Sequence, residues 1–108
     1  MKQFTLNVNS AVKPLEKYWE LCVGSCHATT ALREDYRKQL EQCQREIGFR
    51  YVRFHGLFDD DMSVLVQDNY SKEMRLSFTK IDSIFDFLLS IKMKPFVELG
   101  FMPEWLQS

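Results

Sequence analysis

The chain has 108 residues, of which 45% are hydrophobic and 27% are charged, and its formal net charge is −1. This length supports one domain or part of one, and the apolar content excludes an intrinsically disordered chain. Lys and Arg are scattered among Asp and Glu without a basic stripe, and no stretch approaches the ~20 apolar residues of a membrane span. Neither nucleic acid nor a membrane is therefore expected as a partner.

An extended lead-in and a short strand are expected at the start of the chain. Residues 1–18 include Pro14, which disfavours a helix ahead of the aromatic pair Tyr18-Trp19. The stretch YWELCVGSC (18–26) is then interpreted as a short buried strand that ends at Gly24-Ser25.

The next pattern predicts an amphipathic helix that starts near Ala31. Apolar side chains recur at spacings of four, four, three and four, with polar residues between them, at Leu32, Tyr36, Leu40, Cys43 and Ile47. Thr29 or Thr30 is the expected helix cap, and Gly48 is the expected stop.

Two more strands and a second helix follow. RYVRFH (50–55) predicts a strand, and the polar, irregular residues 58–76 predict a long loop. A helix is expected over about 80–91, where Thr79-x-x-Asp82 resembles a capping box. Its apolar face consists of Ile81, Ile84, Phe85, Leu88 and Leu89. KPFVELGFMP (94–103) predicts a third strand that begins at a proline.

Strands that alternate with helices predict an α/β fold built from parallel β-α units. IGFRYVRFHGLF (47–58) and IKMKPFVELGFM (91–102) align without gaps and repeat the order of helix end, turn, strand and glycine. A β/α barrel and an open doubly wound sheet both fit this repeat. Three strands complete neither architecture, so open sheet edges and self-association are expected.

Several segments together resemble glycoside hydrolase family 39, the β-xylosidase group. They are CVGSC (22–26), LREDYRKQL (32–40), IGFRYVRFHGLFDDDMSV (47–64) and FTKIDSIFDFLLSIKMKPFVELGFMP (78–103). The resemblance implies that residues 1–108 are an N-terminal fragment of the catalytic domain. This fragment would be the first three β/α units of a (β/α)8 TIM-type barrel. The resemblance further implies a retaining hydrolase that acts on β-xylosides or xylo-oligosaccharides, with a xylose-type sugar as its ligand.

Two features depart from the family pattern. The family's acid/base glutamate lies in an Asn-Glu-Pro motif on a later strand and its nucleophile lies later still, whereas this chain has no Asn-Glu dipeptide. Retaining glycosidases need two carboxylates across the scissile bond, so no catalytic residue is expected here and the 108-residue chain alone is expected to be inactive. The second departure is Lys92, where the family usually has glycine.

Two other functions stay open beside the glycosidase. Similar barrels occur in bacterial transcription regulators of the AraC type, which share the Phe-Asp-Asp-Asp-Met form of the loop at 58–62. In such a protein this segment would sense a sugar rather than help to cleave it. The third interpretation is a small interaction protein that self-associates through its open sheet. The Cys-Val-Gly stretch at 22–24 favours the enzyme lineage.

His55 and Asp60 are the candidate sugar-binding residues. His55 ends the second predicted strand, on the side where β/α barrels carry their active sites, and the family's matching histidine contacts the sugar. The aspartates at 59–61 could bind hydroxyls, cap a turn or hold a hard cation, and a solvated turn suits at least two of them. Asp60 matches one of the family's acidic pair and is expected to shape the loop beside the sugar.

Arg53 and Glu98 are a candidate ion pair. Arg53 shares a strand face with His55, and Glu98 shares a face of the next strand with Phe96, because side chains alternate along strands. If both faces point into the barrel, the pair would hold a polar floor under the sugar. Unrelated surface charges fit these positions equally well.

No metal or cofactor is expected. Cys22, Cys26 and His27 invite a zinc interpretation, but a tetrahedral site needs a fourth ligand, which only Cys43 or His55 could supply from a remote position. The odd number of cysteines indicates reduced thiols. The first ten residues also lack the apolar core of a signal peptide, so a cytoplasmic location is expected.

Overall fold

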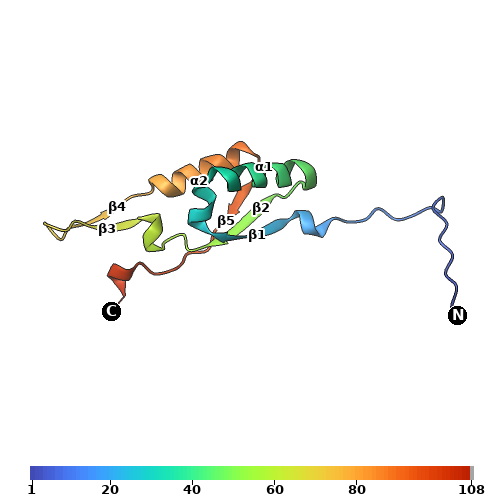
Figure 1. Ribbon diagram of the computed structural model, residues 1–108, viewed down its shortest axis with the longest axis horizontal. Coiled ribbons are helices and arrows are strands. Elements are labelled where there is room, and N and C mark those ends of the chain that lie inside the picture. Colours follow the sequence, from blue (N-terminus) through green and yellow to red (C-terminus); the bar gives the residue numbers. More distant parts are fainter. Residues whose placement is uncertain (108) are drawn as a thin grey trace.

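The computed structural model describes residues 1–107 and contains a three-stranded parallel sheet with two helices. The sheet order is β1 (Cys22–His27), β2 (Tyr51–His55), β5 (Lys94–Phe96). The helices α1 (Glu34–Ile47) and α2 (Thr79–Ser90) connect these strands and both cover the same face of the sheet (Figure 1). The predicted α/β class and the parallel β-α order are thus confirmed. The number of barrel units and the closure of a barrel stay predictions.

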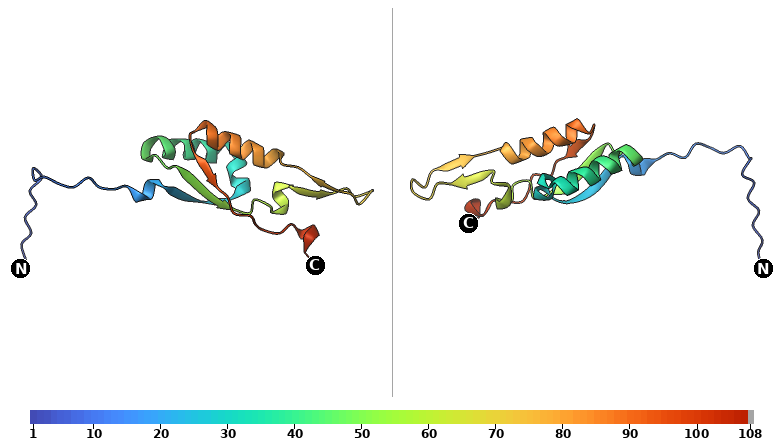
Figure 2. Two further views of the ribbon diagram at one scale, coloured as in Figure 1. Left: turned by 180° about the vertical axis from the view of Figure 1, so that it is seen from behind. Right: turned by 45° about the horizontal axis from the view of Figure 1, so that its top comes forward.

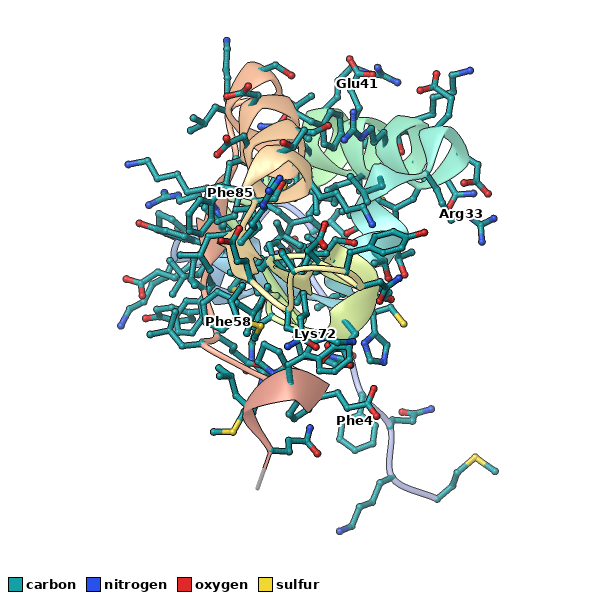
Figure 3. The ribbon with its side chains drawn as sticks, turned by 90° about the vertical axis from the view of Figure 1, so that its left-hand side faces the viewer. Phe4, Arg33, Glu41, Phe58, Lys72 and Phe85 are labelled. Carbon is teal, nitrogen blue, oxygen red and sulfur yellow. The ribbon has the colours of Figure 1, made fainter. Side chains whose placement is uncertain are left out.

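The core lies between the helices and the central strand. Side chains alternate along β2, so that Val52 and Phe54 are buried against the helices while Arg53 points to the uncovered face. One apolar cluster forms the core, and it consists of Ala28, Ala31, Leu40, Val52, Phe54, Leu57, Met62, Val64, Ile81, Ile84, Leu88 and Met93. Charged side chains such as Glu41 line the outer side of α1 and point away from the sheet (Figure 3).

Helix α1 ends as predicted but begins differently. Gly48 follows its last residue at φ 90°, a left-handed conformation that suits glycine, and its N–H closes the last turn. The predicted cap at Thr29 or Thr30 is wrong. These threonines lie in a short 3-10 helix (Ala28–Leu32), and the extended backbone of Arg33 separates that helix from α1.

The predicted long loop over residues 58–76 is wrong in part. It contains a 3-10 turn (Asp60–Met62) and a small antiparallel hairpin of β3 (Leu65–Gln67) and β4 (Met74–Leu76). Asp68 closes the hairpin turn by accepting the backbone N–H groups of Tyr70 and Ser71. The hydrogen bonds from Ser71 and Tyr70 lower the pKa of the Asp68 carboxyl.

Helix α2 lies within one residue of the prediction, but its capping box does not form. Phe78 is the residue before the helix, so Thr79 and Asp82 each lie one position too late for reciprocal capping. The Thr79 hydroxyl instead accepts a hydrogen bond from Ser77 Oγ at 3.3 Å. The third strand is shorter than predicted, because only Lys94–Phe96 pair with β2 before the chain leaves the sheet.

The first strand begins later than predicted, ends at His27 rather than at Gly24-Ser25, and is mostly exposed rather than buried. Residues Tyr18–Glu20 form a 3-10 turn, and β1 begins at Cys22. The lead-in runs away from the sheet in an extended path, as predicted (Figure 2). It accounts for the long dimension of the chain, which measures 76 × 32 × 21 Å. Within residues 1–107 no helix combines the length and apolarity needed to cross a membrane.

Candidate functional site

The carboxyl ends of the parallel strands meet at one edge of the sheet. β1 ends at His27 and β2 ends at His55, and these two residues are register partners. The segment after β5 reaches the same edge, where the Gly100 carbonyl accepts the N–H of Phe58 at 2.9 Å. Parallel α/β sheets carry their ligands at this edge, so it is the place where these chain segments can build a site.

Two imidazoles lie side by side at this edge. The ring centroids of His27 and His55 are 4.3 Å apart with the rings at 60°, and the ring of Phe101 lies 6.3 Å from that of His55. Among residues 1–107 the His55 ring makes no hydrogen bond, so both of its nitrogens stay available to a ligand. The edge thus combines polar imidazole groups with an aromatic ring.

His27 is also held by the loop that follows β2. Its Nδ1 lies 3.2 Å from Oδ2 of Asp59. Sequence reasoning considered His27 only as a zinc ligand and missed its place beside His55. The available signal was its position at the end of the first predicted strand, which a parallel sheet brings level with the end of the next.

The other two aspartates of the loop contact two further segments. Both carboxylate oxygens of Asp60 accept the backbone N–H of Glu104, at 3.1 and 3.3 Å. Asp61 Oδ2 accepts the hydroxyl hydrogen of Thr29 at 3.0 Å, which is the bond that this threonine makes in place of a helix cap. The acidic loop therefore joins the segments that follow β1 and β5.

Gly56 makes room for this arrangement. Its φ is +74°, and a Cβ built on it would lie 2.3 Å from Asp59 Oδ2 and 2.9 Å from His27 Nδ1. Any side chain at this position would displace the carboxylate from the imidazole. The glycine that follows His55 is thus required both by the backbone conformation and by the space that the contact fills.

Arg53 lies on the sheet face that the helices leave uncovered, whereas Glu98, which was predicted within the third strand, follows the end of β5 at Phe96. The Arg53 guanidinium forms an ion pair with the Glu98 carboxylate, and their side chains are 56% and 29% exposed. Arg53 is the register partner of Gly24 on one side and of Phe96 on the other. Because Gly24 carries no side chain, the arginine has open space on that side of the strand.

A second polar contact lies between β1 and α1. The hydroxyls of Ser25 in β1 and Tyr36 in α1 are 2.6 Å apart, and Tyr36 is half-buried. Burial raises the pKa of the Tyr36 phenol, and the hydrogen bond with Ser25 opposes this rise only in part. Cys43, which also borders this region, is exposed. In the part of the chain that the structure describes, no three His, Cys, Asp or Glu side chains gather as a metal site.

Comparison with known proteins places these features in a family. The family described as Glycosyl hydrolases family 39 matches residues 2–108. A β-xylosidase of Caldicellulosiruptor saccharolyticus is 57% identical over 106 residues, which cover 98% of this chain and 22% of that protein. A β-xylosidase of Geobacillus stearothermophilus is 41% identical over 95 residues, which cover 86% of this chain and 19% of that protein.

Solved structures agree with this assignment. The family 39 β-xylosidase of Caulobacter crescentus superposes with a TM-score of 0.80 at 37% identity, covering 94% of this chain and 22% of that one. The family 39 enzyme of Xanthomonas axonopodis pv. citri superposes with a TM-score of 0.74 at 36% identity, and the match covers 87% of this chain and 18% of that one. The chain thus spans about a fifth of the length of its relatives. It belongs to glycosyl hydrolases family 39.

Proposed function

We propose that the chain forms the N-terminal part of the (β/α)8 barrel of a retaining β-xylosidase and that His55 contributes to its sugar pocket. The observation that carries the proposal is the position of His55 at the carboxyl edge of the sheet, with its ring free of hydrogen bonds among residues 1–107. A neutral imidazole can donate one hydrogen bond and accept another, which suits a sugar hydroxyl. The matching relatives are β-xylosidases, which favours hydrolysis over sugar sensing.

The segment's proposed role is binding rather than bond cleavage. In a retaining glycosidase one carboxylic acid protonates the leaving oxygen while a second carboxylate attacks the sugar to form a covalent intermediate, which water then hydrolyses. The 108 residues contain no Asn-Glu dipeptide that would match the acid/base motif. His55 would hold a hydroxyl of the sugar while carboxylates from other strands act. Asp60 would shape the loop beside the sugar through its bonds to Glu104.

The ion pair of Arg53 and Glu98 is proposed to form the polar floor of the barrel under the sugar. In the 108-residue chain both side chains reach solvent, so their coupling energy is expected to stay below about 1 kcal/mol. Barrel closure would remove water from this face and raise the coupling between the two charges, because the effective dielectric constant falls. A double-mutant cycle with Arg53→Gln and Glu98→Gln measures the coupling. The same small coupling in a complete barrel would contradict the proposed floor.

A chimera tests the proposed function. Residues 2–107 replace the matching segment of the Caldicellulosiruptor saccharolyticus β-xylosidase, and hydrolysis of an aryl β-xyloside is measured. The chimera is expected to be active, and His55→Gln is expected to lower kcat/KM at least about tenfold, as the loss of one substrate hydrogen bond would. Lys38→Gln, on the exposed side of α1, serves as the control and is expected to leave kcat/KM unchanged.

Two outcomes would contradict the proposal. One is a chimera that melts cooperatively like the parent enzyme but cleaves no β-xyloside. The other is an active chimera in which His55→Gln keeps the full kcat/KM. Circular dichroism melts of each variant separate a folding failure from a loss of binding.

The uncovered sheet face suggests how the 108-residue chain behaves in isolation. The exposed apolar side chains of β5 and of the segment after it are Phe96, Val97, Leu99, Phe101, Met102, Trp105 and Leu106. An apolar groove of about 250 Å³ lies nearby, lined by Phe58, by residues of the hairpin such as Leu76 and by residues of the same segment such as Leu106. We propose that the isolated chain self-associates through this surface, since large apolar patches seek cover.

A further inference from the structure

His27 has one ring nitrogen engaged and one available. An ionised carboxylate only accepts hydrogen bonds, so the contact between His27 Nδ1 and Asp59 Oδ2 at 3.2 Å requires the proton on Nδ1. In the neutral imidazole Nε2 is then an acceptor, and among residues 1–107 it makes no hydrogen bond. The His27 side chain is 48% exposed, so this acceptor is within reach of a ligand.

The orientation of His27 is set by the loop after β2 rather than by its own strand. The contact between imidazole and carboxylate lies directly over the Cα of Gly56, where any Cβ would collide with both groups. Asp59 is itself mostly covered, with its side chain 22% exposed. A carboxylate held in this way selects one tautomer and one ring orientation for its histidine.

His27 and His55 place two polar rings side by side at the carboxyl edge of the sheet. They are register partners on adjacent strands, and their rings meet edge to face with centroids 4.3 Å apart. Two imidazoles at this spacing can bind neighbouring hydroxyls of a single sugar ring, one of them by accepting a hydrogen bond at His27 Nε2.

We propose that His27 is a second sugar-contacting residue beside His55 and that Asp59 acts as a positioning residue that fixes the Nδ1–H tautomer of His27. The ligand class is a polyhydroxylated sugar ring that donates a hydroxyl hydrogen to His27 Nε2. The inference rests on the proposed function for its ligand, but the part that concerns Asp59 and His27 can be tested without it.

Nuclear magnetic resonance of the 108-residue chain tests the positioning role. The chain has two histidines, so its imidazole nitrogen signals are assigned with His27→Gln alone. We expect His27 in the Nδ1–H form, and we expect Asp59→Asn to shift it toward the Nε2–H form because an amide can donate to Nδ1. The matched control is Asp61→Asn, whose carboxylate contacts Thr29 instead and should leave the His27 tautomer unchanged. An Nε2–H tautomer in the unchanged chain, or no response to Asp59→Asn, would overturn the positioning role.

Kinetics in the chimera test the sugar contact. His27→Gln is expected to lower kcat/KM about tenfold, the size of one lost hydrogen bond. Asp59→Asn is expected to lower it less, because the imidazole stays in place. The double variant should be no worse than His27→Gln alone, since Asp59 acts through the imidazole, whereas two independent structural defects would multiply. Full activity in His27→Gln, or multiplicative losses, would overturn the inference.

The two experiments separate this inference from the proposed function. If the folded chimera cleaves no β-xyloside, the proposed function fails, and the nuclear magnetic resonance experiment still decides whether Asp59 sets the tautomer of His27. If the chimera is active and His55→Gln weakens it while His27→Gln does not, the proposed function stands and the sugar contact of His27 is wrong.

Discussion

The carboxylate of Asp60 accepts the backbone N–H of Glu104 across a sequence separation of 44 residues, with an Oδ1–N distance of 3.1 Å. This bond ties the loop after β2 to the segment after β5. A second bond, from the N–H of Phe58 to the carbonyl of Gly100, joins the same two segments. The edge that carries His55 is thus connected by side-chain and backbone contacts.

Removal of the Asp60 carboxylate is expected to loosen this connection. Asp60→Ala should lower the free energy of unfolding by about 1 kcal/mol, because an exposed but charge-assisted hydrogen bond is lost. Urea unfolding of the chain measures the change. Glu41→Ala, an exposed residue of α1, is the control and should change the free energy by less than about 0.5 kcal/mol. Equal losses in the two variants would show that the bond to Glu104 contributes nothing.

Gly56 and Gly24 offer a matched pair of substitutions. Gly56→Ala should lower the free energy of unfolding by more than about 1 kcal/mol, because alanine is strained at φ +74° and its Cβ would meet Asp59. Gly24→Ala should cost less, since nothing lies within 4 Å of a Cβ at that position. Thermal melts compare the two. A larger loss for Gly24→Ala would contradict the described geometry.

Replacing the residue with a left-handed backbone after α2 by glycine should stabilise the fold. Lys92 has φ +61°, where a side chain costs about 1–2 kcal/mol relative to glycine, and the greater freedom of glycine in the unfolded chain offsets part of this. Lys92→Gly is therefore expected to raise the free energy of unfolding by up to about 1 kcal/mol. Lys94→Gly, in β5, should lower it, because glycine weakens a strand. A loss in both variants would contradict this account of Lys92.

The raised pKa of Tyr36 predicts that the fold loses stability at alkaline pH. Burial raises the pKa of its phenol above the usual value of about 10. Between the two pKa values the folded chain keeps the phenol proton that the unfolded chain has lost. The contribution of the protonated Tyr36 phenol to the free energy of unfolding is therefore full below about pH 10, and it is lost as pH rises through the folded pKa. Urea unfolding between about pH 8 and 11 should show a steeper loss in the unchanged chain than in Tyr36→Phe. Tyr70→Phe, at a fully exposed position, should retain the steep loss.

The uncovered sheet predicts self-association. Light scattering of the isolated chain is expected to give a mass above the 12.9 kDa of a single copy. Leu99→Lys should shift the mass toward the monomer, because it places a charge among the exposed apolar side chains after β5. Leu6→Lys, in the extended lead-in, is the control and should leave the mass unchanged. A monomeric mass together with a cooperative melt of the unchanged chain would contradict the prediction.

Local patterns were sufficient for the elements that a single segment determines. The apolar repeat through Tyr36 and Leu40 predicted α1, and Gly48 predicted its end, because side-chain burial on one helix face and a left-handed terminal residue depend on near neighbours. The alternation in RYVRFH predicted β2 for the same reason. The order of these elements and the family segments then predicted a parallel α/β sheet.

The site depended on contacts that no local pattern specifies. His27, Thr29 and Glu104 each bind a different member of the Asp59–Asp61 run, over separations of 32, 32 and 44 residues. The sequence alone determined that acidic residues follow His55 and a glycine, and that helices alternate with strands. Only the tertiary structure decided which aspartate meets which partner and that His27 lies beside His55. The physical reason is that the parallel register of β1 and β2 sets these distances, and that register results from the packing of the whole sheet against its helices.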